Sequence, residues 1–244
     1  ARANSEAVHQ SDIDGLYEIY WGNGNTFDLN NGSLKGTLRG LIDLRDGNNN
    51  EYFHGKLTSI GQMTDANGVS HQTVKIDVDA SYLKDINKSN LSENGKILLG
   101  NQLAYYDSFS FKYDADTDTY SYEFVLSDAT KNPEAVGTSK IGMDSSIGVA
   151  NSYQGIPYYM QQMSEWVREF AQAFDDILTQ DGSVDEYGDP AKDLFVARGK
   201  SNEEEYICNV VPVEGQSYTI SCSDASYFKM TAETFKVRDA VERN

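Results

Sequence analysis

The chain has 244 residues, of which 38 are acidic and 20 basic, giving a net charge of −18. Such acidity, with no basic patch, argues against binding to nucleic acids or anionic membranes and is typical of a solvated surface. The 16 tyrosines and 10 phenylalanines favour β structure in a chain long enough for one large or two modest domains.

Several other protein classes are excluded. No apolar run approaches the roughly 20 residues of a membrane-spanning helix, and the first ten residues contain no hydrophobic signal-peptide core. The protein is therefore cytoplasmic, exported without such a signal, or represented without its ends. Two cysteines and three scattered histidines form neither a disulfide framework nor a zinc motif. We expect no metal and no cofactor site.

Two short elements are predicted before residue 51. Residues 12–29 alternate β-favouring types around a GNGN turn and predict a hairpin. Leu34–Asp46 follows helical spacing, with Ser33 as a plausible N-cap and Gly47 after its end. We interpret that segment as a short amphipathic core helix.

Residues 51–150 predict an antiparallel β domain. Val74, Ile76 and Val78 alternate with charged residues, as a half-buried strand requires. Further along, KILLGNQLAYYDSFSFKY and YSYEFVLSD flank the turn DADTDT and predict a long hairpin. The borders of the segment are rich in Gly and Asn, which suits an inserted domain whose ends lie close together.

The longest predicted helix is Ile156–Thr179. Apolar residues recur at intervals of three and four and cover roughly 200° of its surface, whereas one partner helix needs only about 100°. We therefore expect it to pack against two or more partners. The opposite, polar face carries Gln161, Gln162, Glu165, Arg168, Glu169, Gln172, Asp175 and Asp176.

A helical core is expected between the two helices. Leu34–Asp46 should cover part of the apolar face of the long helix, and the rest should be exposed, covered by β structure or buried in a second copy. If Trp166 is buried, its replacement by Ala should cost about 3–5 kcal/mol. The residues predicted to form this core are Leu38, Leu41, Met163, Trp166, Phe170 and Phe174.

The last part of the chain reads as an acidic loop followed by β structure. Residues 204–223 predict a hairpin around VEGQ, and the final segment predicts a short turn and another strand. Cys208 and Cys222 lie on the two sides of that hairpin. They either form a cross-strand disulfide or remain free thiols, and neither has a neighbour that would make it catalytic.

No motif makes a case for catalysis or a cation. Asp114–Asp118 begins like an EF-hand loop, but Thr119 stands where that loop needs glycine and Val125 where it needs glutamate. The loop Asp181–Asp193 is rich in carboxylates without that spacing. Neither GxSxG, a P-loop nor GxGxxG occurs. We therefore predict no catalytic residues.

Four segments, taken together, resemble one protein family. GSLKGTLRGLIDLRDG, GIPYYMQQMSEWVREFAQAFDDIL, DGSVDEYGDPAKDLF and YFKMTAETFKV are similar in order and spacing to segments of the flagellar hook-associated protein 1 family, the hook–filament junction proteins. The long-helix pattern of that family matches Trp166, Val167, Phe170, Ala171 and Phe174. The match covers roughly residues 12–50 and 155–240.

The resemblance implies a structural, non-enzymatic component of the bacterial flagellum. It would be extracellular, exported without a cleavable signal peptide, and would contact the hook protein, the second hook-associated protein and copies of itself. The chain departs from the family in its roughly 100-residue β insert and in lacking the terminal assembly helices. These departures imply a central fragment, monomeric or weakly associating.

The predicted fold class is α+β. Residues 1–50 and 151–200 would form a discontinuous helical body with an N-terminal hairpin, 51–150 the inserted β domain, and 201–244 a β-rich segment beginning a further outer domain. A second hypothesis is an adhesin-like or glycan-binding module, because exposed tyrosines can stack on sugars. Its candidate residues are Tyr105, Tyr106, Tyr113, Tyr120 and Tyr122. An enzymatic insert is a third possibility, without a visible catalytic constellation.

Overall fold

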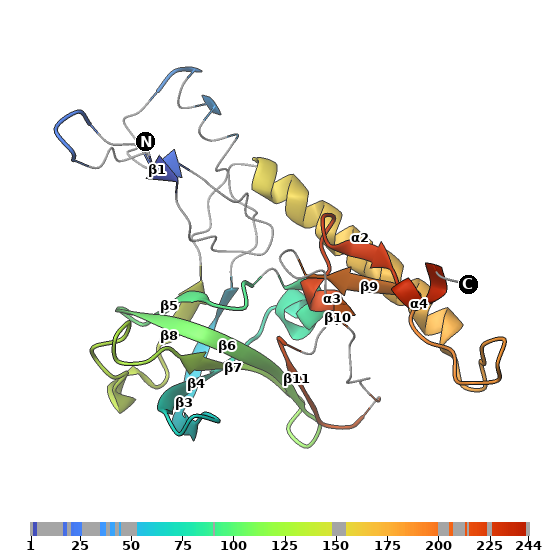
Figure 1. Ribbon diagram of the computed structural model, residues 1–244. Coiled ribbons are helices and arrows are strands. Elements are labelled where there is room, and N and C mark those ends of the chain that lie inside the picture. The colour runs from blue at the N-terminus through green and yellow to red at the C-terminus, as the bar shows by residue number, and fades with distance from the viewer. Residues whose placement is uncertain are drawn as a thin grey trace.

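The computed structural model describes residues 2–3, 17–18, 21–25, 35–37, 40–41, 44, 53–89, 91–147, 155–199, 205–206, 213, 215–223 and 226–242. Figure 1 shows a strongly curved sheet with the long helix α2 running diagonally above it. The elements β9, β10 and α3 lie between these two parts. The fold is therefore mixed α and β, as predicted, but β structure dominates and the expected helical body does not.

The main sheet has seven strands, and all its pairings are antiparallel. Their order is β11-β6-β5-β8-β3-β4-β7, and β7 also pairs with β6, so six of the strands close into a barrel-like ring. The ring strands are β3 (Phe53–Thr64), β4 (Ser70–Asp77), β5 (Gly95–Leu99), β6 (Gln102–Asp114), β7 (Thr119–Leu126) and β8 (Asp144–Ile147). All of these strands lie within the predicted β segment, 51–150.

Alternating side chains fill the inside of this sheet. Val74 and Ile76 of β4 are buried, as their alternation predicts. In β6 the buried positions change from even to odd, because a register shift between Tyr106 and Ser108 inserts one extra residue. The core contains a cluster of aromatic rings in contact, formed by Phe53, Tyr106, Phe109, Phe111, Tyr122 and Phe124.

Short helical turns lie in the connections between strands of the main sheet. They are η1 (Ser81–Lys84), η2 (Ile86–Lys88) and η3 (Thr138–Lys140). The first two bury Leu83 and Ile86 in the main core.

A second, smaller core lies beneath α2 (Ile156–Leu178). Its three-stranded antiparallel sheet has the order β10-β9-β12, formed by Glu205–Tyr206, Phe195–Arg198 and Phe235–Val237. The short helices α3 (Ser226–Lys229) and α4 (Asp239–Glu242) flank it. Its buried members are Val167, Ala171, Ala197 and Met230.

The predicted hairpin at 204–223 is wrong. β10 pairs with β9, whereas β11 (Tyr218–Ser221) pairs with β6 of the main sheet. Strand pairing thus crosses the predicted border at residue 200 and joins the C-terminal segment to both sheets. Neighbouring apolar surface and free strand edges decided these pairings, and local turn residues did not.

Only part of the predicted N-terminal elements can be compared. The turn after Trp21 is present, with the Gly24 N–H donating to the Trp21 carbonyl at 2.9 Å. β2 (Tyr17–Glu18) pairs with β1 (Arg2–Ala3), and the returning strand of the predicted hairpin lies outside the described residues. Helix is present at the described positions Thr37, Gly40, Leu41 and Leu44, and the rest of Leu34–Asp46 is not described.

The aromatic core of the main sheet yields a stability prediction. Phe124 is fully buried among other rings, so Phe124→Ala should lower the free energy of unfolding by about 3–5 kcal/mol. The matched control is Leu103→Ala on β6, because Leu103 is exposed and its loss should change stability by less than about 0.5 kcal/mol. Urea denaturation measures both, and equal effects would contradict this assignment of the core.

Candidate functional site

The two faces of α2 differ in an unexpected way. The face turned toward the rest of the chain is mostly polar or small, and the apolar stripe faces outward. Buried positions recur every three or four residues, at Gln161, Ser164, Val167, Arg168, Ala171 and Asp175. Gln161, Arg168 and Asp175 belong to the polar face, whereas the sequence led us to expect packing by the apolar face.

Arg168 holds this orientation. Its side chain is 1% exposed, and it donates from Nε to the Met230 carbonyl at 2.7 Å. Its Nη1 donates to the carbonyls of Asn87 and Ser89, both at 2.8 Å. One guanidinium therefore ties α2 to the turn beside the main sheet and to the C-terminal segment. Charge-assisted bonds of this kind are among the stronger ones in proteins.

Asp175 makes a second polar anchor, two turns further along α2. One of its carboxylate oxygens accepts the N–H groups of Leu194 and Phe195, at 2.7 and 3.0 Å. The other accepts the Tyr227 hydroxyl at 2.8 Å. These bonds fix the start of β9 and the helix α3 against α2.

Burial controls the charge of this anchor. Desolvation raises the pKa of Asp175 above its ordinary value, although the three hydrogen bonds favour the ionised form. Burial also raises the pKa of nearby Asp193; the charge of Asp175 adds to this rise and that of Arg238 opposes it. The region is therefore sensitive to pH.

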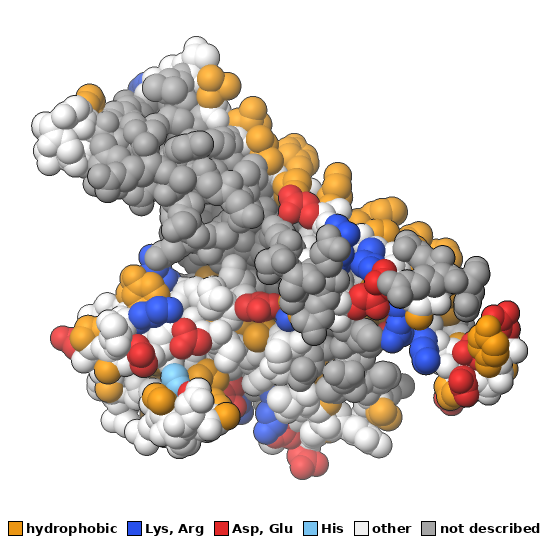
Figure 2. Space-filling view, in the orientation of Figure 1, with side chains coloured by type: hydrophobic (Ala, Val, Ile, Leu, Met, Phe, Trp, Pro, Cys, Tyr) orange, Lys and Arg blue, Asp and Glu red, His pale blue; other side chains and the backbone are white. Residues whose placement is uncertain are grey.

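The outward face of α2 is an exposed apolar stripe. Figure 2 shows orange side chains in a row along one edge of the molecule. Trp166 is 62% and Ile177 64% exposed, so these are not residues on the margin of a core. The stripe comprises Ile156, Tyr159, Met163, Trp166, Phe170, Phe174 and Ile177, of which Phe170 is half-buried.

Aromatic rings join this stripe to the second core. Trp166 stacks on Phe170 with ring centroids 5.4 Å apart, and Phe170 contacts Phe174 and Phe195. Phe195 in turn stacks on Phe235 at 5.0 Å. The stripe is thus supported from below, and its rings are held in place.

Most of the predicted helical core is contradicted. Leu41, Met163, Trp166 and Phe174 are exposed, and the side chain of Leu38 lies outside the described residues. Phe170 alone is partly buried. The physical reason is that hydrogen bonds from Arg168 and to Asp175 turn the polar face inward.

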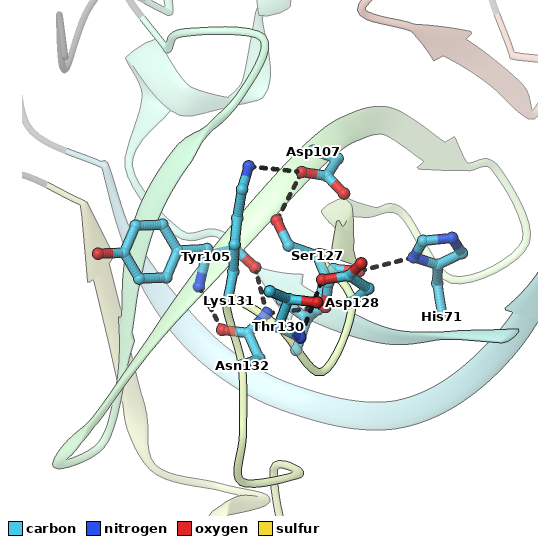
Figure 3. Close-up of polar contacts among 9 residues, drawn as sticks. His71, Tyr105, Asp107, Ser127, Asp128, Thr130, Lys131 and Asn132 are labelled. Atoms are coloured by element: carbon cyan, nitrogen blue, oxygen red, sulfur yellow. Dashed lines mark hydrogen bonds and ion pairs between the residues drawn. The ribbon is translucent and has the colours of Figure 1, made fainter. Parts of the chain in front are cut away.

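Figure 3 shows a polar cluster where the loop after β7 meets the main sheet. Asn132 accepts the Tyr105 N–H and donates to the Tyr105 and Ser127 carbonyls. The Asn132 side-chain amide therefore makes the two hydrogen bonds with the Tyr105 backbone that a neighbouring strand would make. Gln72 does the same with the N–H and carbonyl of Val136. These amides clamp the loop after β7 onto the sheet.

This cluster lacks the geometry of a catalytic site. The Ser127 hydroxyl donates to Asp107 at 2.5 Å, and Lys131 lies 3.5 Å from the same carboxylate. His71 contacts the Leu126 carbonyl and Asp65 instead. A serine nucleophile needs a base oriented toward its hydroxyl by a third group, and here the groups are arranged to hold a loop.

The two acidic segments form turns. Asp114 accepts the Asp116 N–H, and Asp118 adopts a positive φ of 49° in the β6–β7 turn. In the later loop, one oxygen of Asp185 accepts the N–H groups of Tyr187 and Asp189. Within the described part of the chain, no cluster of three or more potential metal ligands occurs.

The remaining candidate residues are the two cysteines and the tyrosines named for a glycan site. Cys222 is a buried free thiol, so it is not bonded to Cys208, which lies outside the described residues. Tyr106 and Tyr122 are buried and cannot stack on a sugar. Tyr113 and Tyr120 pack across strands at 4.6 Å. A glycan site on Tyr105, Tyr113 and Tyr120 stays a prediction.

Comparison with known proteins adds no identification. Neither a family model, a curated protein nor a solved structure matches the chain. None of the described helices is long and apolar enough to cross a membrane.

Removing the Arg168 guanidinium should destabilise the protein. Arg168→Met leaves three carbonyl oxygens without their donor, at about 1–3 kcal/mol each, partly offset by removal of a buried charge. We expect a net loss of about 2–4 kcal/mol in urea denaturation. Arg168→Lys, which keeps the charge without the planar fork, should lose less. A Met variant as stable as the wild type would contradict the anchoring role.

The raised pKa of Asp175 predicts a particular pH dependence. Such a carboxyl favours folding most below its unfolded pKa of about 3.8, and this contribution is lost as pH rises through the folded pKa. Asp175→Asn should therefore flatten the fall in the free energy of unfolding that accompanies a rise in pH above about 3.8. Tyr227→Phe, which removes a bond to the ionised form, should extend that fall to higher pH. An unchanged slope in the Asn variant would disprove the assignment.

Proposed function

We propose that this protein is a structural, non-enzymatic subunit of the bacterial flagellum, of the hook-associated kind found at the hook–filament junction. The observation that carries this proposal is the exposed apolar face of α2. A continuous apolar surface of this length is costly in water and marks a site of assembly. It lies within the segment whose sequence resembles the long helix of the hook-associated protein 1 family.

The arrangement of the chain supports the same proposal. The four segments that resemble the family occur in the family's order, and three of them build α2, the loop after it and the β9–β12 region. In this proposal those elements belong to the subunit body. The barrel-like sheet of Phe53–Ile147 is the inserted domain and decorates the outer surface.

The proposed partners are other flagellar subunits: the hook protein, the second hook-associated protein and copies of the chain itself. The proposed location is extracellular, which suits a net charge of −18. The proposed mechanism is packing, in which helices of the assembly cover the apolar stripe. Nothing in this mechanism needs a cofactor or a catalytic group.

A substitution in the stripe should separate folding from assembly. We expect Trp166→Asp to leave the melting temperature within about 3 °C of the wild type, because the ring is exposed. In the source bacterium, however, the variant should fail to incorporate at the hook–filament junction. Immunogold labelling of isolated flagella measures incorporation.

The matched control is Val69→Asp, which alters an exposed apolar residue in the β3–β4 turn of the main sheet. This variant should be incorporated normally. Wild-type protein found only inside cells, or labelling unrelated to flagella, would overturn the proposed function. If the Trp166→Asp chain assembles as well as the control, the proposed role of α2 in assembly is contradicted.

A further inference from the structure

Three tyrosines lie side by side on neighbouring strands of the main sheet. Tyr113 of β6 is directly opposite Tyr120 of β7 on one side and Tyr218 of β11 on the other. Residues opposite one another on adjacent strands share a face of the sheet and contact each other. All three side chains are half-buried. The sheet therefore holds a row of tyrosine rings in a fixed order, within reach of small molecules in solution.

The rings of Tyr113 and Tyr120 face each other. Their centroids are 4.6 Å apart and their planes differ by 34°, an arrangement close to the offset stacking of aromatic pairs. Rings lying side by side in one plane could not approach so closely. Tyr218 is further from Tyr113, with centroids 5.6 Å apart and planes that differ by 43°. In the part of the chain that the structure describes, Tyr113 and Tyr120 are the closest pair of tyrosine rings.

Tyr113 also has a proton acceptor in place. Its hydroxyl donates to Oδ1 of Asp118 at 3.2 Å. Desolvation and this hydrogen bond raise the pKa of Tyr113 above its ordinary value, so the phenol keeps its proton at neutral pH. A phenol that loses an electron becomes a strong acid, and the loss is easier when the proton passes at the same time to a neighbouring base. The exposed carboxylate of Asp118 is such a base.

We propose that Tyr113 and Tyr120 are a site of oxidative cross-linking, which a peroxidase and hydrogen peroxide convert to dityrosine. Each phenol gives up one electron and one proton, and the proton of Tyr113 passes to Asp118. The two radicals form a carbon–carbon bond between ring positions ortho to the hydroxyls, and the hydrogen on each bonded carbon moves to oxygen as a proton. Overall, the two tyrosines lose two hydrogen atoms and one hydrogen peroxide becomes two waters.

The facing rings suit this reaction better than any other geometry of two tyrosines. The new bond forms between π orbitals that stand perpendicular to the rings, so rings that meet face to face bring these orbitals together. Holding the two reactants in place also removes much of the entropic cost of their meeting. Tyr158 and Tyr159 provide a contrast, because their centroids are 5.3 Å apart but their planes differ by 84°. There the edge of one ring meets the face of the other.

The cross-link would fasten β6 to β7 beside the turn that joins them. The main sheet alone supplies both tyrosines and Asp118, so the reaction does not depend on the chain being part of a flagellum. An extracellular location, as proposed above, would expose the site to oxidants.

The test oxidises the full chain with peroxidase and hydrogen peroxide at low protein concentration, so that collisions between copies are rare. We expect a monomeric product that has the blue fluorescence of dityrosine and a mass lower by two hydrogen atoms. Trypsin cleaves after Lys112 and Lys131, so both tyrosines fall within one peptide. Fragmentation of that peptide in mass spectrometry should be blocked only between Tyr113 and Tyr120.

Three variants assign the roles of the residues. Tyr120→Phe keeps a ring in the sheet but removes the hydroxyl, and most of the fluorescence should be lost. Its matched control is Tyr105→Phe, which changes another half-buried tyrosine of β6 and should leave the yield unchanged. Asp118→Asn should slow the coupling, because an amide is a much weaker base. Asparagine tolerates the positive φ of 49° at this position, and circular dichroism confirms that each variant is folded.

Several results would overturn the inference. They are cross-links formed only between copies, a main product that joins Tyr113 to Tyr218 or Tyr158 to Tyr159, and undiminished fluorescence in the Tyr120→Phe chain. An unchanged rate of coupling in the Asp118→Asn chain would contradict the role of the carboxylate as the proton acceptor.

Discussion

The architecture depends on one buried cation. Arg168 lies at the point where α2, the turn before β5 and the segment after α3 meet, and its guanidinium donates to a carbonyl of each neighbouring segment. A charge in this position is stable only while those carbonyls surround it, because an unpaired buried charge is very costly. The same contacts therefore position three parts of the chain that are distant in sequence.

The exposed stripe on α2 is a consequence of that constraint. A helix cannot turn both Arg168 and Trp166 toward the same neighbour, because these residues lie on different faces. With the guanidinium and the Asp175 carboxylate inside, the aromatic residues must point outward. Contacts from Phe170 to Phe195 then hold the outward rings against the second core. The surface proposed to bind a partner is thus produced by polar contacts on the opposite side of the helix.

The main sheet plays a different part. Its ring of strands closes without α2, and the C-terminal β11 joins it along β6. Lys229 forms an ion pair with Glu93 at 2.9 Å, which links α3 to the loop before β5. These links keep the sheet attached to α2, the helix that carries the apolar stripe. In the proposed assembly, the sheet would be a rigid projection, and its polar clamps around Asn132 and Gln72 would serve stability.

The sequence by itself determined the local elements. Alternation at Val74 and Ile76 predicted a strand, and recurrence at three and four residues predicted α2, because both depend on periods that belong to the backbone. It also identified the apolar face of α2, although it assigned Met163, Trp166 and Phe174 to an internal core. Tertiary structure alone decided which face of α2 is buried, since hydrophobic periodicity cannot show that Arg168 meets three carbonyls from distant segments. It likewise decided the partners of Glu205–Tyr206 and Tyr218–Ser221, because strand edges are matched in space and not along the chain.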